Sequence, residues 1–223
     1  MFGTLFPLTP ESLGRIQHQA SRTVFWEMAP TDAAVVAATG DVVFEKEAWL
    51  TTTLLNYGTC GFSIGHREEH ARHSQRAVAT VLFCGREQAP GVSNLPTAPV
   101  SPDADVLTSL FLDPGFAGTG LEPVLLDAAI MAVVGREAPA VEAFGRRLDL
   151  SAEQLAATGP DVRVICENAG NIGLLDVPTL ESAGFRGVAD HPVLPRLRLD
   201  LPPQQDLLSV EAIDQLLAES SLV

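Results

Sequence analysis

Apolar positions change their spacing along the chain, and this change separates predicted helices from predicted strands. Apolar residues recur at helical intervals over residues 42–56 and again from Leu121 to Ala132, so each of these segments is predicted to bury one helical face. Cap residues or amphipathic spacing predict four further helices, at 10–22, 151–158, 177–185 and 209–220.

Short apolar runs predict the strands, which lie at 2–8, 59–65, 77–85, 105–112, 140–144, 162–166 and 196–201. In the last of these runs apolar and charged residues alternate strictly, which is typical of a half-buried strand. Because strands and helices are interleaved, the sequence predicts a single α/β or α+β domain over residues 1–223, with a central mixed sheet of about seven strands.

The composition fits a globular protein. Apolar residues make up 46% of the 223 positions and charged residues 19%, which is enough for a core and argues against disorder. The chain has no apolar run of about 18 residues, and its N-terminus lacks the basic and apolar regions of a secretory signal. Three scattered cysteines do not form a disulfide framework. We therefore expect a cytoplasmic protein that does not bind membranes.

The chain is strongly acidic, with a formal net charge of −14. This charge weighs against nucleic acid as a partner, because binding there depends on lysine and arginine neutralising phosphates. It is compatible with a cationic substrate such as an amine. It is equally compatible with an acidic surface that only keeps the protein soluble.

The stretch "LFLDPGFAGTGLEPVLLDAA", residues 110–129, joins a predicted strand to a predicted helix through a glycine-rich turn. Such turns often hold phosphate through backbone N–H groups and a helix N-terminus. This turn contains no arginine or lysine, and Glu122 lies close to it. A dinucleotide fingerprint would need a third glycine where Pro123 stands, although Glu142 has nearly the spacing of a ribose-binding acid.

Two other groups of residues suggest chemistry more weakly. His66, His70 and His73 have a spacing that would place three imidazoles on one helical face for zinc, but their stretch also reads as a solvated polar hairpin. Cys166 stands at a predicted strand end, where it is either a nucleophile or a buried apolar-like cysteine. We expect no metal.

Six stretches of the chain point to one family: "TVFWEM", "EKEAWL…NYGTCG", "PTAPVSPDADVLTSLFLDP", "GFAGTGL", "VEAFG" and "ESAGFRGVADHPVLPRLRLDL". In these stretches the chain resembles the GNAT superfamily of N-acetyltransferases, and in particular its actinobacterial members. The matching stretches span about residues 23–201, which is most of the chain.

The resemblance implies a splayed sheet that grips the pantetheine arm of acetyl-CoA, the acetyl donor, between two central strands. The implied cofactor-binding residues lie on the central strand and in the glycine turn: Leu110, Phe111, Leu112, Ala117, Gly118, Thr119, Gly120 and Leu121. The implied reaction transfers acetyl to a primary amine of a small molecule or a protein. Candidates for the general base are Glu142, Asp105 and Glu167, and Asn168 or Asn171 is a candidate for orienting CoA or substrate.

The chain departs from the family pattern at two positions. Gly115 stands where the family's phosphate turn carries arginine or glutamine, and Leu180 stands where many members carry the tyrosine that protonates the CoA thiolate. The only tyrosine, Tyr57, lies in the helix predicted over 42–56 or just beyond it. These departures support a second hypothesis, a GNAT-fold module with weak or no CoA binding that acts in ligand or protein interaction. The helix at 209–220 either caps the domain or pairs two copies as a homodimer.

Overall fold

The computed structural model describes residues 3–66, 76–204, 207–208 and 210–219. Eight strands form one sheet: β1 Gly3–Pro7, β2 Gly61–His66, β3 Ala77–Gly85, β4 Ala104–Leu112, β5 Ala140–Arg146, β6 Leu175–Asp176, β7 Arg186–Ala189 and β8 Arg196–Asp200. Seven of them run in the order β1-β2-β3-β4-β5-β8-β7, and the two-residue β6 pairs with β5. Neighbouring strands are antiparallel except at β4–β5 and β5–β6, which are parallel.

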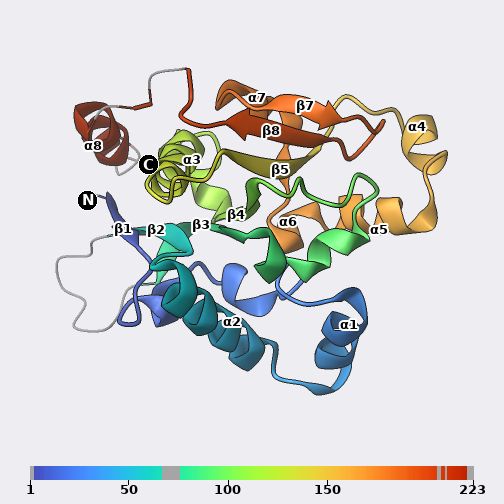
Figure 1. Cartoon of the computed structure of the whole chain (residues 1–223), viewed down its shortest axis with the longest axis horizontal. Helices are drawn as coiled ribbons and strands as arrows, with labels where there is room; N and C mark the ends of the chain where they lie inside the picture. Colours follow the sequence, from blue (N-terminus) through green and yellow to red (C-terminus); the bar gives the residue numbers. More distant parts are fainter. Residues whose placement is uncertain (1–2, 67–75, 205–206, 209, 220–223) are drawn as a thin grey trace.

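Helices cover both faces of this sheet, and their bounds are α1 Pro30–Thr39, α2 Val42–Tyr57, α3 Leu121–Val134, α4 Ala152–Ala156, α5 Pro160–Glu167, α6 Ala169–Ile172, α7 Val177–Ser182 and α8 Val210–Glu219. Helices α1 and α2 lie on one side of β2–β4, and α3 lies on the other (Figure 1). Helix α8 packs against α3 and β1. The structure is therefore a mixed α/β single domain, as the interleaved pattern predicts. No described helix has the length and apolarity needed to cross a membrane.

Capping residues explain why several predicted elements are confirmed close to their expected ends. Asp41 begins α2, because its carboxylate accepts hydrogen bonds from the backbone N–H groups of Val43 and Phe44. Ser151 begins α4 with a complete capping box to Gln154. Strand β3 has the predicted bounds, and it is buried along nearly its whole length.

Two predicted elements are wrong. Residues 162–166 belong to helix α5 rather than to a strand, because Pro160 starts a helical turn and only one helical face, which includes Ile165 and Cys166, is buried. Residues 10–22 form two separate 3₁₀ turns rather than one helix. The backbone N–H of Gln17 donates to the hydroxyl of Thr80 on β3, so it is not available to a continuous helix.

The sheet separates two packed layers of side chains. The α3 face carries the larger core, in which Leu107, Val141 and Leu197 meet the apolar side of α3. On the other face, Trp26 packs with Phe144 and with the buried residues of α5 and α6. Trp26 has only 1% of its surface exposed, so it is a core residue.

Strands β4 and β5 pair along only half of their length. The parallel ladder joins Ala104–Leu107 to Ala140–Ala143 and stops there. At the same point β4 contains a bulge, because Ser109 and Leu107 pair with consecutive residues of β3 and Thr108 is left over. Beyond the bulge β4 and β5 no longer pair with each other. This splay between the two strands is the feature that the resemblance predicts.

Candidate functional site

Residues 171–176 occupy the space between the splayed halves of β4 and β5, and we call them the closing segment. On one side, the backbone N–H of Leu110 on β4 donates to the carbonyl of Gly173 at 2.9 Å. On the other side, the last two residues of the closing segment form β6 and pair with Gly145 and Arg146 of β5. The N–H of Gly145 points to the other edge of β5, where it donates to the carbonyl of Pro195, just before β8, at 3.0 Å. Strand β6 therefore lies on the side of β5 that faces β4.

Side chains from three parts of the chain hold the closing segment in place. The indole N–H of Trp26 donates to the carbonyl of Ile172 at 2.7 Å inside the core. The side-chain amide of Gln19 donates to the carbonyl of Asn171 at 3.2 Å. Arg146 forms an ion pair with Asp176 at 3.1 Å. With the bond from Leu110 to Gly173, three consecutive carbonyls of the segment accept hydrogen bonds from distant residues.

The closing segment is also packed tightly. Ile172, Leu174 and Leu175 each keep 8% or less of their surface exposed. Gly173 has a left-handed backbone with φ of +65°, and a Cβ built on it would lie 2.7 Å from the ring of Phe111. Only glycine fits this position, because both the backbone conformation and the close approach exclude a side chain.

Two of the three β4 residues that the resemblance assigns to pantetheine, Leu110 and Phe111, contact the closing segment. The N–H of Leu110 is bonded to Gly173, and the ring of Phe111 packs on the same glycine. Leu112 is in register with Ala79 of β3, and its N–H points to the same edge of β4 as that of Leu110, because N–H groups two residues apart on a strand share an edge. The backbone of the closing segment therefore uses one of the β4 backbone groups, the N–H of Leu110, that the resemblance assigns to pantetheine.

The glycine turn keeps part of the geometry of a phosphate cradle. Gly118 and Gly120 have left-handed φ angles of +74° and +82°, and Leu121 begins α3. However, the N–H groups of Ala117 and Thr119 donate to carbonyls within the turn itself, at 3.4 and 3.2 Å. Of the five turn residues that the resemblance assigns to the cofactor, residues 117–121, two therefore already use their backbone N–H groups within the protein.

The surroundings of the turn are also unfavourable for phosphate. No arginine or lysine stands within residues 110–129, and Glu122 lies in the first turn of α3. A methyl carbon of Leu216 on α8 lies 3.3 Å from a Cβ built on Gly120, so α8 packs beside the turn. An anion here would meet backbone dipoles and a carboxylate without any basic side chain from these residues.

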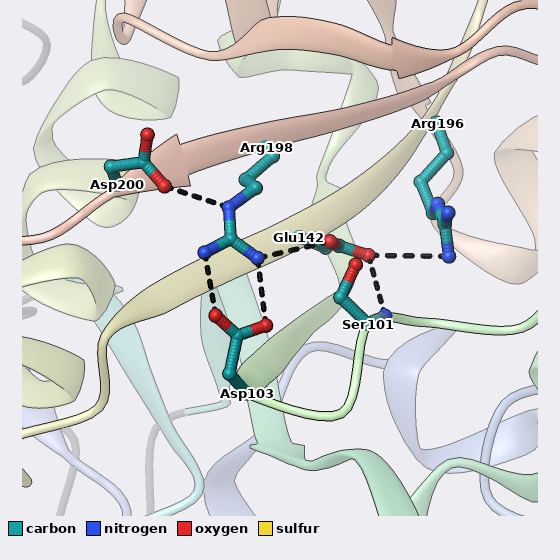
Figure 2. Close-up of polar contacts among 6 residues, drawn as sticks. All are labelled: Ser101, Asp103, Glu142, Arg196, Arg198 and Asp200. Carbon is teal, nitrogen blue, oxygen red and sulfur yellow. Dashed lines mark hydrogen bonds and ion pairs between the residues drawn. The ribbon is translucent and has the colours of Figure 1, made fainter.

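Glu142 sits in the middle of a buried ion network (Figure 2). Its side chain is fully buried, and its two oxygens lie 3.5 Å from Arg198 and 3.3 Å from Arg196. The backbone N–H of Ser101 donates to the same carboxylate at 3.1 Å. Arg198 also binds both oxygens of Asp103 at 2.9 Å, and these hydrogen bonds hold the pKa of Asp103 below its usual value. The network ties the loop before β4 to β5 and β8.

The other two candidate bases lie elsewhere. Asp105 pairs in register with Val141, so it points to the α3 face of the sheet, whereas Glu142 points to the opposite face. Burial raises the pKa of Asp105, and its ion partner Arg136, at 3.2 Å, opposes that rise. Glu167 is exposed on α5 and faces Arg163 at 4.0 Å. The structure does not bring these three carboxylates together.

Leu180, which replaces the family's tyrosine, and Tyr57, the chain's only tyrosine, lie in different surroundings. Leu180 is fully buried in the core beside Gly145. The hydroxyl of Tyr57 donates to the side chain of Gln88 at 2.7 Å. Tyr57 therefore does not take the place of the tyrosine that Leu180 replaces.

The metal and cysteine hypotheses find no support among the described residues. His70 and His73 lie outside the described part of the chain, and within that part no group of three or more histidine, cysteine or acidic side chains is placed to hold a metal. Cys166 is a free, buried residue of α5, and burial raises the pKa of its thiol. A raised pKa disfavours the thiolate that a nucleophile requires.

Sequence reasoning missed the closing segment and the residues that hold it. One signal was present: a glycine interrupts the apolar run "NIGLL", which is typical of a close backbone approach inside a sheet. Nothing in the pattern indicated that Leu110, more than 60 positions earlier, would be its partner.

Comparisons with known proteins bear on the fold alone. No family model and no curated protein sequence matches the chain. Among solved structures it resembles an N-acetyltransferase from Staphylococcus aureus Mu50, with a TM-score of 0.50 and 14% identity over 90% of this chain and 99% of that one. It also resembles yncA, a presumed acetyltransferase from Salmonella typhimurium solved with acetyl-CoA, with a TM-score of 0.50 and 13% identity over 94% and 99% of the two chains. The chain thus has the fold of the GNAT N-acetyltransferases.

Proposed function

We propose that this chain is a GNAT-fold module that does not use acetyl-CoA and acts in ligand or protein interaction. The observation that carries the proposal is the hydrogen bond from Leu110 to Gly173, which places backbone of the closing segment where the pantetheine arm would pair with β4. A slot filled by the protein's own main chain cannot also hold a cofactor.

The energy needed to open the slot supports this proposal. Withdrawing the closing segment would expose Ile172, Leu174 and Leu175 to water, at about 1.5–3 kcal/mol for each side chain. The total is on the order of 5 kcal/mol before any hydrogen bond is counted, and a penalty of that size would weaken a micromolar affinity to about the millimolar range.

The glycine turn does not offset this penalty. A hydrogen bond to a charged group contributes roughly 1.5–3 kcal/mol, and Gly115 supplies none where the family carries arginine or glutamine. Glu122 adds repulsion to any phosphate that reaches the turn. Opening the slot and binding the pyrophosphate are therefore both unfavourable.

Acetyl transfer from acetyl-CoA to a primary amine, of a small molecule or a protein, is the rival function. Two observations favour it: the splay between β4 and β5 and the glycines at positions 118 and 120, which are the features that the resemblance assigns to the donor site. It requires the closing segment to leave the space between β4 and β5.

Acetyl-CoA binding to the intact chain separates the two functions. In calorimetry and in thermal unfolding we expect only weak binding heat and a rise in Tm of no more than about 1–2 °C at about 1 mM acetyl-CoA, because a millimolar Kd makes RT ln(1 + [L]/Kd) only about 0.4 kcal/mol. A Kd in the micromolar range would overturn the proposal. Gly118→Glu is the control variant: loss of that binding in the variant would place acetyl-CoA at the turn and establish the rival function.

A further inference from the structure

A cavity of about 470 Å³ lies directly outside the closing segment. Asn171 and Ile172 of that segment form one wall, Asn168 and Val164 of the α5–α6 region form another, and Arg22 and Phe25 close the third. Its volume is in the range of small-molecule sites, and its lining combines apolar surface with a few polar groups, as such sites do.

Arg22 gives this cavity a positive charge in a strongly acidic protein. It is the only ionisable side chain among the described residues that line the cavity. Its Nε donates to the imidazole of His18 at 2.9 Å, and within the described part of the chain no carboxylate forms an ion pair with it. By contrast Arg163, on the neighbouring helix α5, faces Glu167. The terminal nitrogens of Arg22 are therefore suited to an anion, with a carboxylate as the best geometric match.

Each amide side chain around the cavity donates one hydrogen bond within the protein. The side-chain amide of Asn168 donates to the carbonyl of Val164 at 2.9 Å, and that of Asn171 donates to the side-chain oxygen of Asn168 at 3.3 Å. The side-chain amide of Gln19 donates to the carbonyl of Asn171. These donations fix the orientation of each amide, so the side-chain oxygens of Asn171 and Gln19 remain as acceptors for an N–H group.

We infer that this cavity binds a small carboxylate that carries an N–H group and an apolar side chain, as an N-acylated apolar amino acid does. The carboxylate binds Arg22, the N–H group donates to the oxygens of Asn171 and Gln19, and the apolar side chain packs on Phe25, Val164 and Ile172. This assignment rests on the closed slot of the proposed function, because Asn171 and Ile172 of the closing segment form one wall of the cavity, and it adds a ligand class and a binding site.

Three probes with matched shapes test the assignment by calorimetry on the full chain. N-acetylphenylalanine carries all three features, its C-terminal amide lacks the charge, and 3-phenylpropionate lacks the N–H group. We expect N-acetylphenylalanine to bind most tightly and the amide at least about tenfold more weakly, because a charge-assisted contact is lost. We expect 3-phenylpropionate to lie between the two.

Two variants locate the binding. Arg22→Gln is expected to weaken N-acetylphenylalanine about tenfold or more while leaving the amide unchanged. Arg163→Gln removes a nearby cation that does not line the cavity and is expected to change nothing. Both side chains are well exposed, so neither variant is expected to unfold.

Any of three results would overturn the assignment: no binding of N-acetylphenylalanine at about 10 mM, equal affinity for the acid and the amide, or equal effects of the two variants. The acetyl-CoA titration tests the closed slot, and the three probes test the carboxylate site. Failure of the carboxylate site leaves the closed slot standing, whereas acetyl-CoA binding would overturn the closed slot and would also displace the wall that Asn171 and Ile172 give this cavity.

Discussion

The glycine turn follows β4 and the closing segment bonds to β4, and the two regions differ in what they retain from the fold. The turn retains two left-handed glycines at the start of α3, with open space around Gly118. The closing segment fills the space that such a turn would serve, and Gly173 is pressed against Phe111. Under the proposed function, the local backbone motif of the turn is retained while the closing segment prevents acetyl-CoA from binding between β4 and β5.

The largest expected effect contrasts the glycines of the two regions. Gly173→Ala should lower the free energy of unfolding by about 3 kcal/mol, because the left-handed backbone and the contact with Phe111 both resist a side chain. Gly118→Ala meets no neighbour within 4 Å and should cost only about 1–2 kcal/mol from its backbone angle. Urea unfolding measures both, with Gly170→Ala as the control because that glycine is helical and open. Equal losses at positions 173 and 118 would show that the segment is not packed as described.

Removing the indole donor of Trp26 should have the next largest effect. Trp26→Phe leaves the buried carbonyl of Ile172 without its hydrogen bond and should cost about 2 kcal/mol. It should also speed amide exchange in the closing segment. Trp49→Phe removes an indole bond to Gln88 elsewhere and should leave that exchange unchanged. Similar exchange in both variants would contradict the role given to Trp26.

The ion pair between Arg146 and Asp176 should matter less. Each side chain is about a third exposed, so solvent screens the pair, and Arg146→Gln should cost no more than about 1 kcal/mol. Hydrogen exchange at β6 should rise slightly. Arg163→Gln, which breaks an exposed pair on α5, is the matched control. A loss of several kcal/mol in Arg146→Gln would mean that this ion pair, rather than packing, holds the segment.

The smallest expected effect is the most informative about the turn. Gly115→Arg restores a basic residue where the family carries one, and a Cβ at position 115 meets no neighbour. If the missing charge were the only defect, acetyl-CoA affinity should rise by about one to two orders of magnitude. The closed slot predicts only weak acetyl-CoA binding by calorimetry in this variant, as in the wild type. Micromolar binding in the variant alone would assign the defect to the turn.

Local patterns predicted most of the sheet and several helices, because their signals lie within a few residues. Apolar spacing over residues 42–56 marks α2, Ser151 marks the start of α4, and the alternation over residues 196–201 marks β8. The run at 162–166 predicts a strand because its β-branched residues favour one. In the structure it forms α5, because one helical face of the run packs against the core.

The candidate site was harder to predict because its contacts join distant parts of the chain. The alternating pattern places Arg196 and Arg198 on one face of a strand, but it does not say that Glu142 on β5 lies opposite them. Gly173 signals a close approach without naming Leu110 as its partner. Resemblance supplied the splay between β4 and β5, and only the three-dimensional arrangement revealed what fills it.

The contact between Gly173 and Phe111 offers the most direct test of the closed slot. Protons on these two residues lie close enough for a nuclear Overhauser effect, since a Cβ at Gly173 would stand 2.7 Å from the Phe111 ring. The measurement is that effect in the intact chain, without acetyl-CoA and then with about 1 mM acetyl-CoA, where a micromolar ligand would be saturating. A closed slot predicts the same cross-peak in both spectra. Loss of the cross-peak on adding acetyl-CoA would show that the closing segment leaves to admit the cofactor, and would contradict the proposal.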